Sequence, residues 1–438
     1  QLDGTGIRLH KLRVPDAVDY PDWLAAVLPE NGRVGLDYFC TSVSGMKELQ
    51  AKLAPKGIQL VDKNEFIGDL WIDRPALPEG KLFTVPAEVA GKSAQEKIRM
   101  VQDALREKNA DYFLFSALDE IAWLFNIRCN DIEYNPVAIA YAVGGRERSW
   151  LFVKRPKVSQ EVAETLGCAN VEIRDYHHLF LFLDETGKDA RFCVDANSLN
   201  FAVYHKITSL AAVTETVSPV IFAKSVKTPE EIQGFREACV KDSVAITKFF
   251  YWLESNIGNK LTETAVSEKL TALRALDKAY VSDSFENISA YGNNAALPHY
   301  SAVPGADSIL EPKGLYLVDS GGQYTHGTTD ITRTVSLGEL TSLEKEDYTI
   351  VLKGMIALRR SLFPKGTRGC NIDAIARQPM WQTCRNFGHG TGHGIGFFLN
   401  VHEGPQTIRQ DLKDQPICPG MVTSDEPGIY RAGVHGIR

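Results

Sequence analysis

Three histidines lie close together in a glycine-rich stretch near the C-terminal end of the chain. His389, His393 and His402 fall within "HGTGHGIGFFLNVHEGP", residues 389–405, together with five glycines. Neutral imidazole binds metal ions, and it also donates a hydrogen bond to a developing oxyanion. Glycine lets the backbone pass close to a bound group because it carries no Cβ. We therefore expect a metal or substrate site here, since neither GxGxxG, the phosphate-loop pattern nor HExxH is matched.

The glycines also limit the local structure of this stretch. His389 and His393 are four residues apart and would share one face of a helix, but five glycines make a helix unfavourable. A strand or an extended loop is the better prediction, with His393 and His402 reaching one pocket from different segments. A single histidine is most often structural, whereas three within fourteen residues favour a site.

Two aspartates flank a glycine-containing turn in "YLVDSGGQYTHGTTDITRTV". The apolar run 315–318 predicts a strand that ends at Asp319, and Asp330 and Thr332 would share one face of the returning strand. Antiparallel pairing would place Asp319 and Asp330 side by side. Two carboxylates that close repel, so one keeps its proton unless a cation lies between them. Turn aspartates on a solvated strand are the competing interpretation, and the apolar run leading into Asp319 argues against it.

A third acidic residue stands in "MVTSDEPGIY". Met421 and Val422 predict a strand that leads toward Glu426, and Pro427 favours an extended conformation at Glu426. An acid at the end of a strand suits a metal ligand or a general base. Glu-Pro-Gly is also ordinary turn chemistry, so this motif is weak by itself.

Taken together, the candidate ligands form a carboxylate-rich set with one imidazole and no thiolate: Asp319, Asp330, His393 and Glu426. Such a set favours Mn²⁺ or Co²⁺, with Zn²⁺ possible, over a structural zinc site. Several carboxylates offset the repulsion between two adjacent divalent ions. Two such ions can hold a hydroxide and polarise a carbonyl, which is the chemistry of hydrolysis.

The elements that must position these residues divide the chain into three units. An alternating helix and strand pattern runs to about Asp62, and the segment 73–91 is rich in proline and glycine, as in a domain link. A second α/β unit has a predicted helix at 94–110, a strand at 112–116 and a helix at 119–128. A third unit begins near Val226, where Thr228, Pro229 and Glu231 predict a capped helix. Its expected apolar face comprises Ile232, Phe235, Cys239, Ile246, Phe250 and Leu253.

Composition and net charge limit the number of domains, the class of partner and the cellular compartment that we expect. A chain of 438 residues, 44% hydrophobic and 24% charged, is an ordinary globular protein of two or three domains. A net charge of -7 gives no reason to expect nucleic acid or a membrane surface as a partner. The eight scattered cysteines predict mostly buried free thiols in a reducing compartment, which points to the cytoplasm.

Three segments resemble a known catalytic domain: "VDSGGQYTHGTTDITRT", "HGTGHGIGFFLNVHEGP" and "TSDEPGIY" with the final "GIR". They are similar to the Xaa-Pro aminopeptidases (aminopeptidase P) of the pita-bread metallopeptidases. "ALDEIAWLFNIRCNDIEYNPV" resembles the middle domain of the long, three-domain form of that family. The resemblance implies an α/β (α+β) chain with a pita-bread catalytic domain at 226–438. Two creatinase-N-terminal-like α/β domains would precede it, at 1–64, where only the C-terminal part is present, and at 65–225.

The resemblance also assigns roles by position. The metal-binding residues of the family correspond to Asp319, Asp330, His393 and Glu426, with two divalent ions per chain, Mn²⁺ by preference and Co²⁺ or Zn²⁺ as alternatives. Glu426 would also move the proton of the bridging water. The substrate-binding positions correspond to His299, His389, His402, Tyr430 and Arg438, and the catalytic ones to Glu426, His389 and His402.

The implied activity is removal of an N-terminal residue from a peptide with proline in second position, by a homodimer. Prolidase shares the fold and the ligand types but cleaves only dipeptides, and the middle-domain likeness argues against it. Methionine aminopeptidase would lack two leading domains. A pita-bread binding module without activity would have lost its ligand residues. In the family a second glutamate follows "GIR", so we expect the natural protein to continue beyond Arg438 and to begin before Gln1.

Overall fold

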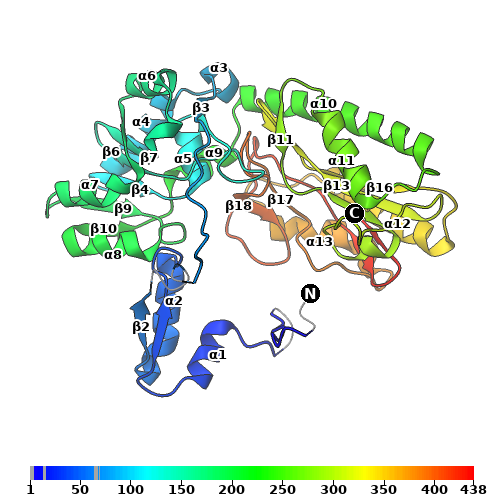
Figure 1. Ribbon diagram of the computed structural model, residues 1–438, viewed down its shortest axis with the longest axis horizontal. Coiled ribbons are helices and arrows are strands. Elements are labelled where there is room, and N and C mark those ends of the chain that lie inside the picture. The colour runs from blue at the N-terminus through cyan, green and yellow to red at the C-terminus, as the bar shows by residue number, and fades with distance from the viewer. Residues whose placement is uncertain (1–3, 13–15, 64–67, 69) are drawn as a thin grey trace.

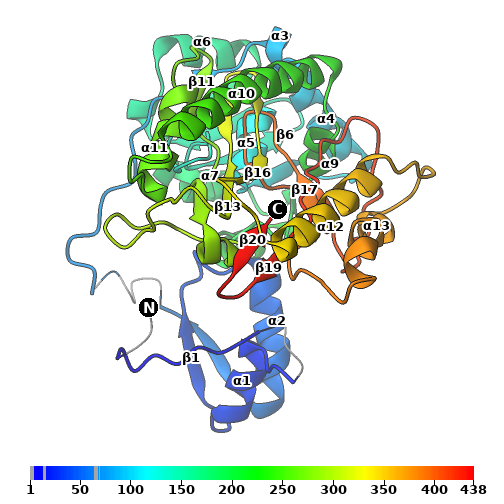
Figure 2. The same ribbon diagram turned by 90° about the vertical axis from the view of Figure 1, so that its right-hand side faces the viewer.

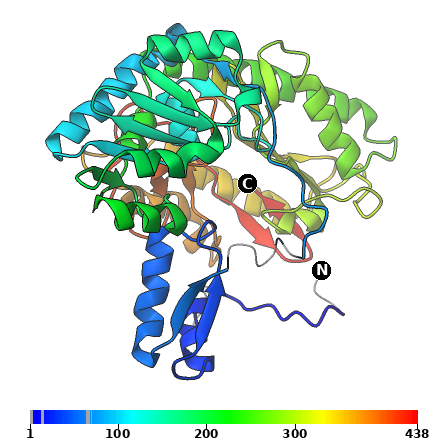
Figure 3. The same ribbon diagram turned by 60° about the vertical axis from the view of Figure 1, so that its left-hand side comes forward.

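The computed structural model describes residues 4–12, 16–63, 68 and 70–438, and it has three parts (Figure 1). A small N-terminal unit lies below the middle unit, and the middle unit lies beside the C-terminal unit. The N-terminal unit consists of α1 (Tyr20–Val27), β1 (Arg33–Leu36), α2 (Val43–Leu53), η1 (Ala54–Lys56) and β2 (Gln59–Asp62). Its two strands are parallel, and its core forms around Leu49, Leu53 and Ile58. This unit projects away from the other two (Figure 3).

The middle unit is built on a six-stranded mixed sheet with the strand order β10-β9-β4-β6-β7-β8. Its first elements are β3 (Phe83–Thr84), α3 (Ala87–Ala90), α4 (Ala94–Glu107), β4 (Tyr112–Phe115), α5 (Leu118–Leu124), β5 (Ile127–Arg128), β6 (Ala140–Gly145), β7 (Ser149–Val153) and η2 (Arg155–Lys157). The later ones are α6 (Gln160–Cys168), β8 (Val171–Arg174), η3 (Tyr176–His178), α7 (Leu179–Glu185), β9 (Arg191–Val194), α8 (Phe201–Leu210), β10 (Ala212–Glu215) and α9 (Pro219–Ser225).

Both faces of this sheet are covered by helices (Figure 3). Side chains alternate along a strand, so Phe113 and Phe115 of β4 enter one hydrophobic core while Leu114 enters the other. This double burial explains why the central strands are almost continuously apolar.

Two sequence predictions for the middle unit need correction. The helix expected at 119–128 ends at Leu124, because Asn126 adopts a left-handed φ of 51° and turns the chain into β5. The segment 73–91, expected to be a link, contains β3, which pairs antiparallel with β5 at Phe83 and Arg128. Arg128 therefore lies in a strand rather than on a helix.

The C-terminal unit combines several short sheets with long helices on its outside (Figure 2). Its first elements are α10 (Pro229–Asn256), α11 (Glu263–Arg274), β11 (Tyr280–Asp283), β12 (Ile288–Tyr291), η4 (Gly292–Ala296), β13 (Leu315–Ser320), β14 (Gly322–Tyr324), β15 (Gly327–Thr328) and β16 (Ile331–Ser336). The remainder are α12 (Ser342–Arg359), α13 (Gly369–Trp381), β17 (Gly392–Gly394), β18 (Glu403–Ile408), β19 (Ile429–Arg431) and β20 (His435–Ile437). The sheets have the orders β12-β13-β16, β11-β14-β15, β17-β18 and β19-β20.

The predicted capping of α10 is confirmed. The Thr228 hydroxyl accepts a hydrogen bond from Glu231 N at 3.1 Å, and Thr228 N donates to the Glu231 carboxylate at 2.9 Å. The predicted apolar face is only partly right. Phe235 is buried, but Cys239 is exposed, because the buried stripe of the helix passes through Asp242 instead.

All eight cysteines are free, but the expectation that most are buried is wrong. Cys129 and Cys193 are buried, whereas Cys40, Cys168, Cys239 and Cys384 are exposed. Among the residues that the structure describes, no helix is both long enough and apolar enough to cross a membrane.

Candidate active site

Asp330, His393 and Glu426 converge in the C-terminal unit, and one ligand atom from each lies within 4.8 Å of the others. The His393 Nε2 atom is 3.2 Å from Asp330 Oδ2 and 3.1 Å from Glu426 Oε1. Asp330 directly precedes β16, His393 lies in β17, and Glu426 lies shortly before β19. The site is therefore assembled from three segments that are distant in the sequence.

Backbone hydrogen bonds place Glu426 beside His393. The chain around Ser424 runs along β17, with Ser424 N donating to His393 O at 2.9 Å and Glu426 N donating to Thr391 O at 2.8 Å. His393 N does not bond to a backbone carbonyl here but to the Ser424 hydroxyl, at 3.0 Å. The regular strand predicted from Met421 is consequently wrong, because isolated bridges and a side-chain hydrogen bond replace the ladder.

Asp319 lies in β13, and Asp330 directly precedes β16, the antiparallel neighbour of β13. In the pairing of β13 with β16, Asp319 is opposite Thr332. Asp330 stands two residues before Thr332, diagonally across from Asp319 on the same face. The turn between the strands contains the additional hairpin β14–β15, which the sequence reading missed. Asp319 Oδ2 accepts a hydrogen bond from Arg438, and its Oδ1 is buried without a partner among the residues that the structure describes.

The orientation of His393 suits metal binding. Its Nδ1 atom is 2.9 Å from the Gly394 carbonyl oxygen, which can only accept, so Nδ1 carries the proton and Nε2 faces the carboxylates. Burial would lower the pKa of His393, but hydrogen bonds to Asp330 and Glu426 outweigh it and raise the pKa to about 10. Burial, with the charges of Asp319 and Glu426, raises the pKa of Asp330. The cluster thus concentrates negative charge that a divalent cation would neutralise.

A continuous hydrogen-bond chain links His389 to Asp319. His389 Nδ1 donates to the Gly390 carbonyl at 2.7 Å, which leaves Nε2 as an acceptor for the Tyr430 hydroxyl at 2.7 Å. Arg438 Nη1 donates to the Tyr430 oxygen at 2.8 Å, and Arg438 Nη2 donates to Asp319. Burial lowers the pKa of His389, so the imidazole is neutral and acts in this chain as the terminal acceptor.

His402 and His299 lie next to the cluster. The His402 ring stands across that of His393, and burial together with the neighbouring His393 lowers the pKa of His402. His299 is exposed on the loop after η4, near enough to His402 to lower that pKa further. Arg438 ties the same loop to the site through the Pro298 carbonyl, at 3.3 Å.

Comparison with known proteins identifies the family. Residues 233–438 match metallopeptidase family M24, and residues 73–231 match the creatinase/prolidase N-terminal domain. The whole chain is 40% identical, over 457 residues, to a probable Xaa-Pro aminopeptidase P of Paracoccidioides lutzii, covering 74% of that protein. The chain belongs to the Xaa-Pro aminopeptidase P family. The corresponding protein of Neosartorya fischeri is also 40% identical, with 69% of it covered.

Solved structures agree with this family assignment. X-prolyl aminopeptidase from Caenorhabditis elegans, described as a cytosolic enzyme with a di-nuclear active site, superposes with a TM-score of 0.94 at 32% identity, covering 100% of this chain and 73% of that one. Xaa-Pro dipeptidase from Bacillus anthracis is similar with a TM-score of 0.64 at 25% identity, covering 79% of this chain and 93% of that one. The chain accordingly has the fold of the family, with creatinase-type and pita-bread domains.

Sequence reasoning missed a buried ion pair, Arg274 with Asp242, that contacts the residues next to Asp319 and Asp330 in the chain. Arg274 donates to Asp242 at 2.6 Å and to the Ser320 hydroxyl at 2.9 Å, while the Thr329 hydroxyl donates to Asp242 at 2.5 Å. Ser320 follows Asp319 and Thr329 precedes Asp330 in the chain. The signal that could have revealed the pair was an aspartate on the apolar face of α10.

Two residues of helix α13 hold the segment that contains His389. On α13, Arg377 donates to the His389 carbonyl at 2.8 Å, and Asp373 accepts a hydrogen bond from the Thr391 hydroxyl at 2.5 Å. Both α13 residues are buried. The segment that contains His389 is therefore fixed by two residues of α13 that stand 12 and 18 positions before their partners in the chain.

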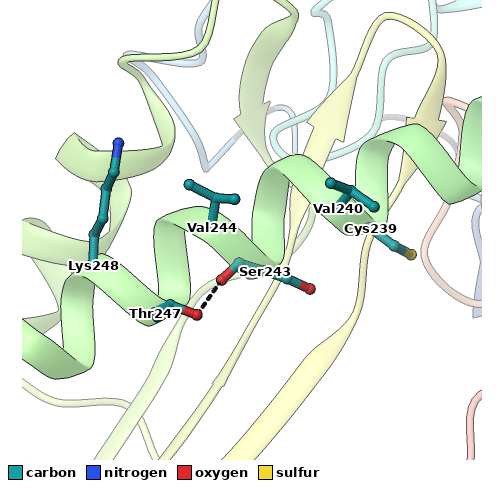
Figure 4. A pocket seen from close by; sticks show the side chains of 6 residues that line it. All are labelled: Cys239, Val240, Ser243, Val244, Thr247 and Lys248. Carbon is teal, nitrogen blue, oxygen red and sulfur yellow. Dashed lines mark hydrogen bonds between the residues drawn. The ribbon is translucent and has the colours of Figure 1, made fainter.

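A separate hollow of about 440 Å³ lies on the solvent side of α10 (Figure 4). It is lined by Cys239, Val240, Ser243, Val244, Thr247 and Lys248. All six side chains belong to one helix, and none is a carboxylate or an imidazole. The hollow therefore lacks the groups that peptide hydrolysis needs.

Proposed function

We propose that this protein hydrolyses the peptide bond between an N-terminal residue and a following proline, using two divalent metal ions. The observation that carries the proposal is the convergence of Asp330, His393 and Glu426 within 4.8 Å. Similarity along the whole chain to Xaa-Pro aminopeptidase P proteins supports the same activity. The peptide partner would therefore carry proline in second position.

The residues present fit a divalent ion at Asp330, His393 and Glu426, and we propose a second ion beside it, where Asp319 adds a carboxylate. Asp319, Asp330, His393 and Glu426 would hold them, with the unpartnered Asp319 Oδ1 and the inward Nε2 of His393 as donor atoms. A carboxylate-rich set with one imidazole favours Mn²⁺, with Co²⁺ or Zn²⁺ as alternatives. When bound, such ions supply a water of lowered pKa and polarise a carbonyl oxygen.

The protein's own groups would orient the peptide and move protons. Glu426, which accepts a hydrogen bond from the Ser424 hydroxyl at 2.8 Å, would take the proton of the attacking water and pass it to the leaving nitrogen. His402, kept neutral by its lowered pKa, would donate one N–H to the oxyanion that develops on the scissile carbonyl. His389 would act through Tyr430 and Arg438, which it orders, and exposed His299 would contact the peptide beyond the cleaved bond.

Selection for proline has a physical basis. An Xaa-Pro bond is a tertiary amide without an N–H, so no pocket can select it by accepting that hydrogen bond. Selection must come from the shape of the ring site and from an anchored α-amino group.

One assay tests the proposal. After chelation and addition of Mn²⁺, an Xaa-Pro-Xaa tripeptide should be cleaved, an Xaa-Ala-Xaa tripeptide poorly, and neither after N-acetylation. Cleavage of Xaa-Pro dipeptides alone would indicate prolidase activity instead. No cleavage of any peptide by a metal-loaded protein would favour a binding module.

Three further features are proposed on the same basis. A cytoplasmic location is supported by the description of the Caenorhabditis elegans relative as cytosolic. A homodimer and Mn²⁺ as the cellular metal remain proposals. The division of the chain at residues 1–64, 65–225 and 226–438 stays a prediction.

A further inference from the structure

Arg128 of the middle unit reaches into the C-terminal unit. It is buried, at 2% exposure, and donates to the carbonyl oxygens of Phe398, through Nε, and of Phe397, through Nη2 at 3.0 Å. Its Nη1 donates at 2.9 Å to the carbonyls of Ala122 and Ile127. All of these acceptors are neutral, and burial lowers the pKa of Arg128 to about 9. Burying a cation is costly, and the nearby charges of Glu231, Glu403 and Asp119 offset only part of that cost.

The backbone that Arg128 holds is strained. Phe398 has a left-handed φ of 47°, a conformation that bulky residues avoid and that persists only where the surroundings impose it. The Phe398 ring packs against Phe83 of β3, with centroids 6.0 Å apart, and lies 5.5 Å from the Arg128 guanidinium. The middle unit thus contributes both the packing and the hydrogen bonds that hold Phe398.

Phe397 and Phe398 lie on the chain between His393 and His402. The next residue, Leu399, is also fixed, because its carbonyl accepts from Gln323 Nε2 at 2.8 Å, and the same amide donates to Tyr134 O of the middle unit at 3.0 Å. The loop that brings His402 against His393 is therefore anchored outside its own sheet.

The far side of His402 is anchored as well. Glu403 follows His402 and is buried, at 4% exposure. Its carboxylate accepts from Lys224 Nζ at 2.9 Å and from Lys227 Nζ. Lys224 belongs to α9, and it also pairs with Asp119 of α5 at 2.8 Å. Fixed points before and after His402 leave its backbone little freedom.

We propose that Arg128 is a positioning residue for His402: by holding the Phe397 and Phe398 carbonyls, it places the His402 imidazole where the substrate carbonyl must lie. The middle unit then forms part of the substrate site rather than only adjoining it. The expected effect on catalysis rests on the proposed function, whereas the effect on the loop does not.

The test uses Arg128→Lys and Arg128→Met, with Lys154→Met as a matched control because Lys154 pairs with Glu79 at the surface of the middle unit. A displacement of about 1 Å can cost about 100-fold in rate. We expect kcat for an Xaa-Pro-Xaa peptide to fall about 100-fold in Arg128→Met and about 10-fold in Arg128→Lys, with metal content unchanged. Lys154→Met should match the wild type.

Coupling to His402 separates positioning from a general structural defect. In a His402→Ala background, Arg128→Lys should cause no further loss, whereas in a Tyr430→Phe background its 10-fold loss should persist. Equal losses in all backgrounds, or loss of metal in the Arg128 variants, would overturn the proposal.

Hydrogen exchange tests whether Arg128 holds the loop before His402, and it needs no activity assay. Amides of residues 396–403 should exchange faster in Arg128→Lys than in the wild type, while those of β13 remain unchanged. Unchanged exchange at 396–403 would refute the proposal even if Xaa-Pro cleavage is confirmed. Faster exchange in a protein that cleaves no Xaa-Pro peptide would refute only the proposed function. Should Arg128→Met fail to fold, Arg128→Lys, which keeps the charge, supplies both measurements.

Discussion

The imidazole rings of His393 and His402 stand nearly perpendicular, at 83°, with their centroids 4.2 Å apart. His393 directs Nε2 toward Asp330 and Glu426, whereas these two carboxylates act on His402 only as nearby charges, whose effect on its pKa is outweighed by burial and by His393. Two adjacent histidines therefore have different electrostatic surroundings. Hydrogen bonds to carboxylates raise the pKa of His393 against the effect of burial, and burial lowers the pKa of His402.

This difference predicts separate consequences for the two alanine variants. His393→Ala should lose bound metal and activity together, because it removes a ligand atom. His402→Ala should retain metal but lose about 10²–10³ in kcat, the usual cost of removing an oxyanion donor. Metal analysis and kinetics of both purified variants provide the test. Equal metal loss in the two would show that the ligand and substrate roles are wrongly divided.

The buried Asp242–Arg274 pair predicts a combined effect on stability and metal binding. Arg274→Met leaves the Asp242 carboxylate buried without its cation, which typically costs about 3–5 kcal/mol. Ser320 would lose its donor Arg274, and the Asp242 carboxylate that accepts from Thr329 would no longer be held in place, so Asp319 and Asp330 should bind metal more weakly. Urea unfolding and metal titration measure the two effects.

The exposed Arg106–Asp103 pair supplies the control for that variant. Both side chains are more than half exposed, at 60% and 67%, so Arg106→Met should change the stability by less than about 1 kcal/mol. If Arg274→Met were no more destabilising than Arg106→Met, the buried pair could not be what holds the aspartates.

The sequence was informative where chemistry depends on short motifs. Glycine density made a helix unfavourable at His393, which lies in β17, and strand alternation predicted Asp319 and Asp330 on one face, in agreement with the register that places Asp319 opposite Thr332. Both inferences use local geometry, which neighbouring residues in the chain determine.

Contacts between distant segments could not be foreseen in the same way. Arg274 and Asp242 are 32 residues apart, and Arg128 and Phe398 are 270 apart. No local pattern encodes such partners, because tertiary packing selects them. The end of α5 shows the same limit. The apolar periodicity continued to Arg128, but Asn126 adopts a left-handed conformation and starts a strand.

The hydrogen-bond chain from His389 to Arg438 predicts the behaviour of Tyr430→Phe. Loss of the hydroxyl removes the donor to His389 Nε2 and the acceptor for Arg438, so Arg438 and the Pro298 loop become less ordered. A hydrogen bond to a charged group contributes about 1.5–3 kcal/mol, so kcat/KM should fall about 10–100-fold. Metal content should remain that of the wild type. Tyr251→Phe is the control, because Tyr251 is 75% exposed on α10.

Glu120 predicts a pH dependence of stability in the middle unit. Burial raises its pKa to about 7, although the Ser218 hydroxyl, which donates at 2.5 Å, opposes the shift. Because the folded-state pKa lies above the unfolded value of 4.5, the associated stability is complete below pH 4.5 and is lost as the pH rises to about 7. At 1.36 kcal/mol per pKa unit, ionised Glu120 costs about 3 kcal/mol at pH 8. Glu120→Gln should therefore be more stable than the wild type at pH 8 by about 1–3 kcal/mol and nearly equal at pH 5, as the urea midpoint would measure. Glu107→Gln, on the exposed side of α4, should show no such difference, and an equal gain at both pH values would mean that packing rather than ionisation explains the Glu120 variant.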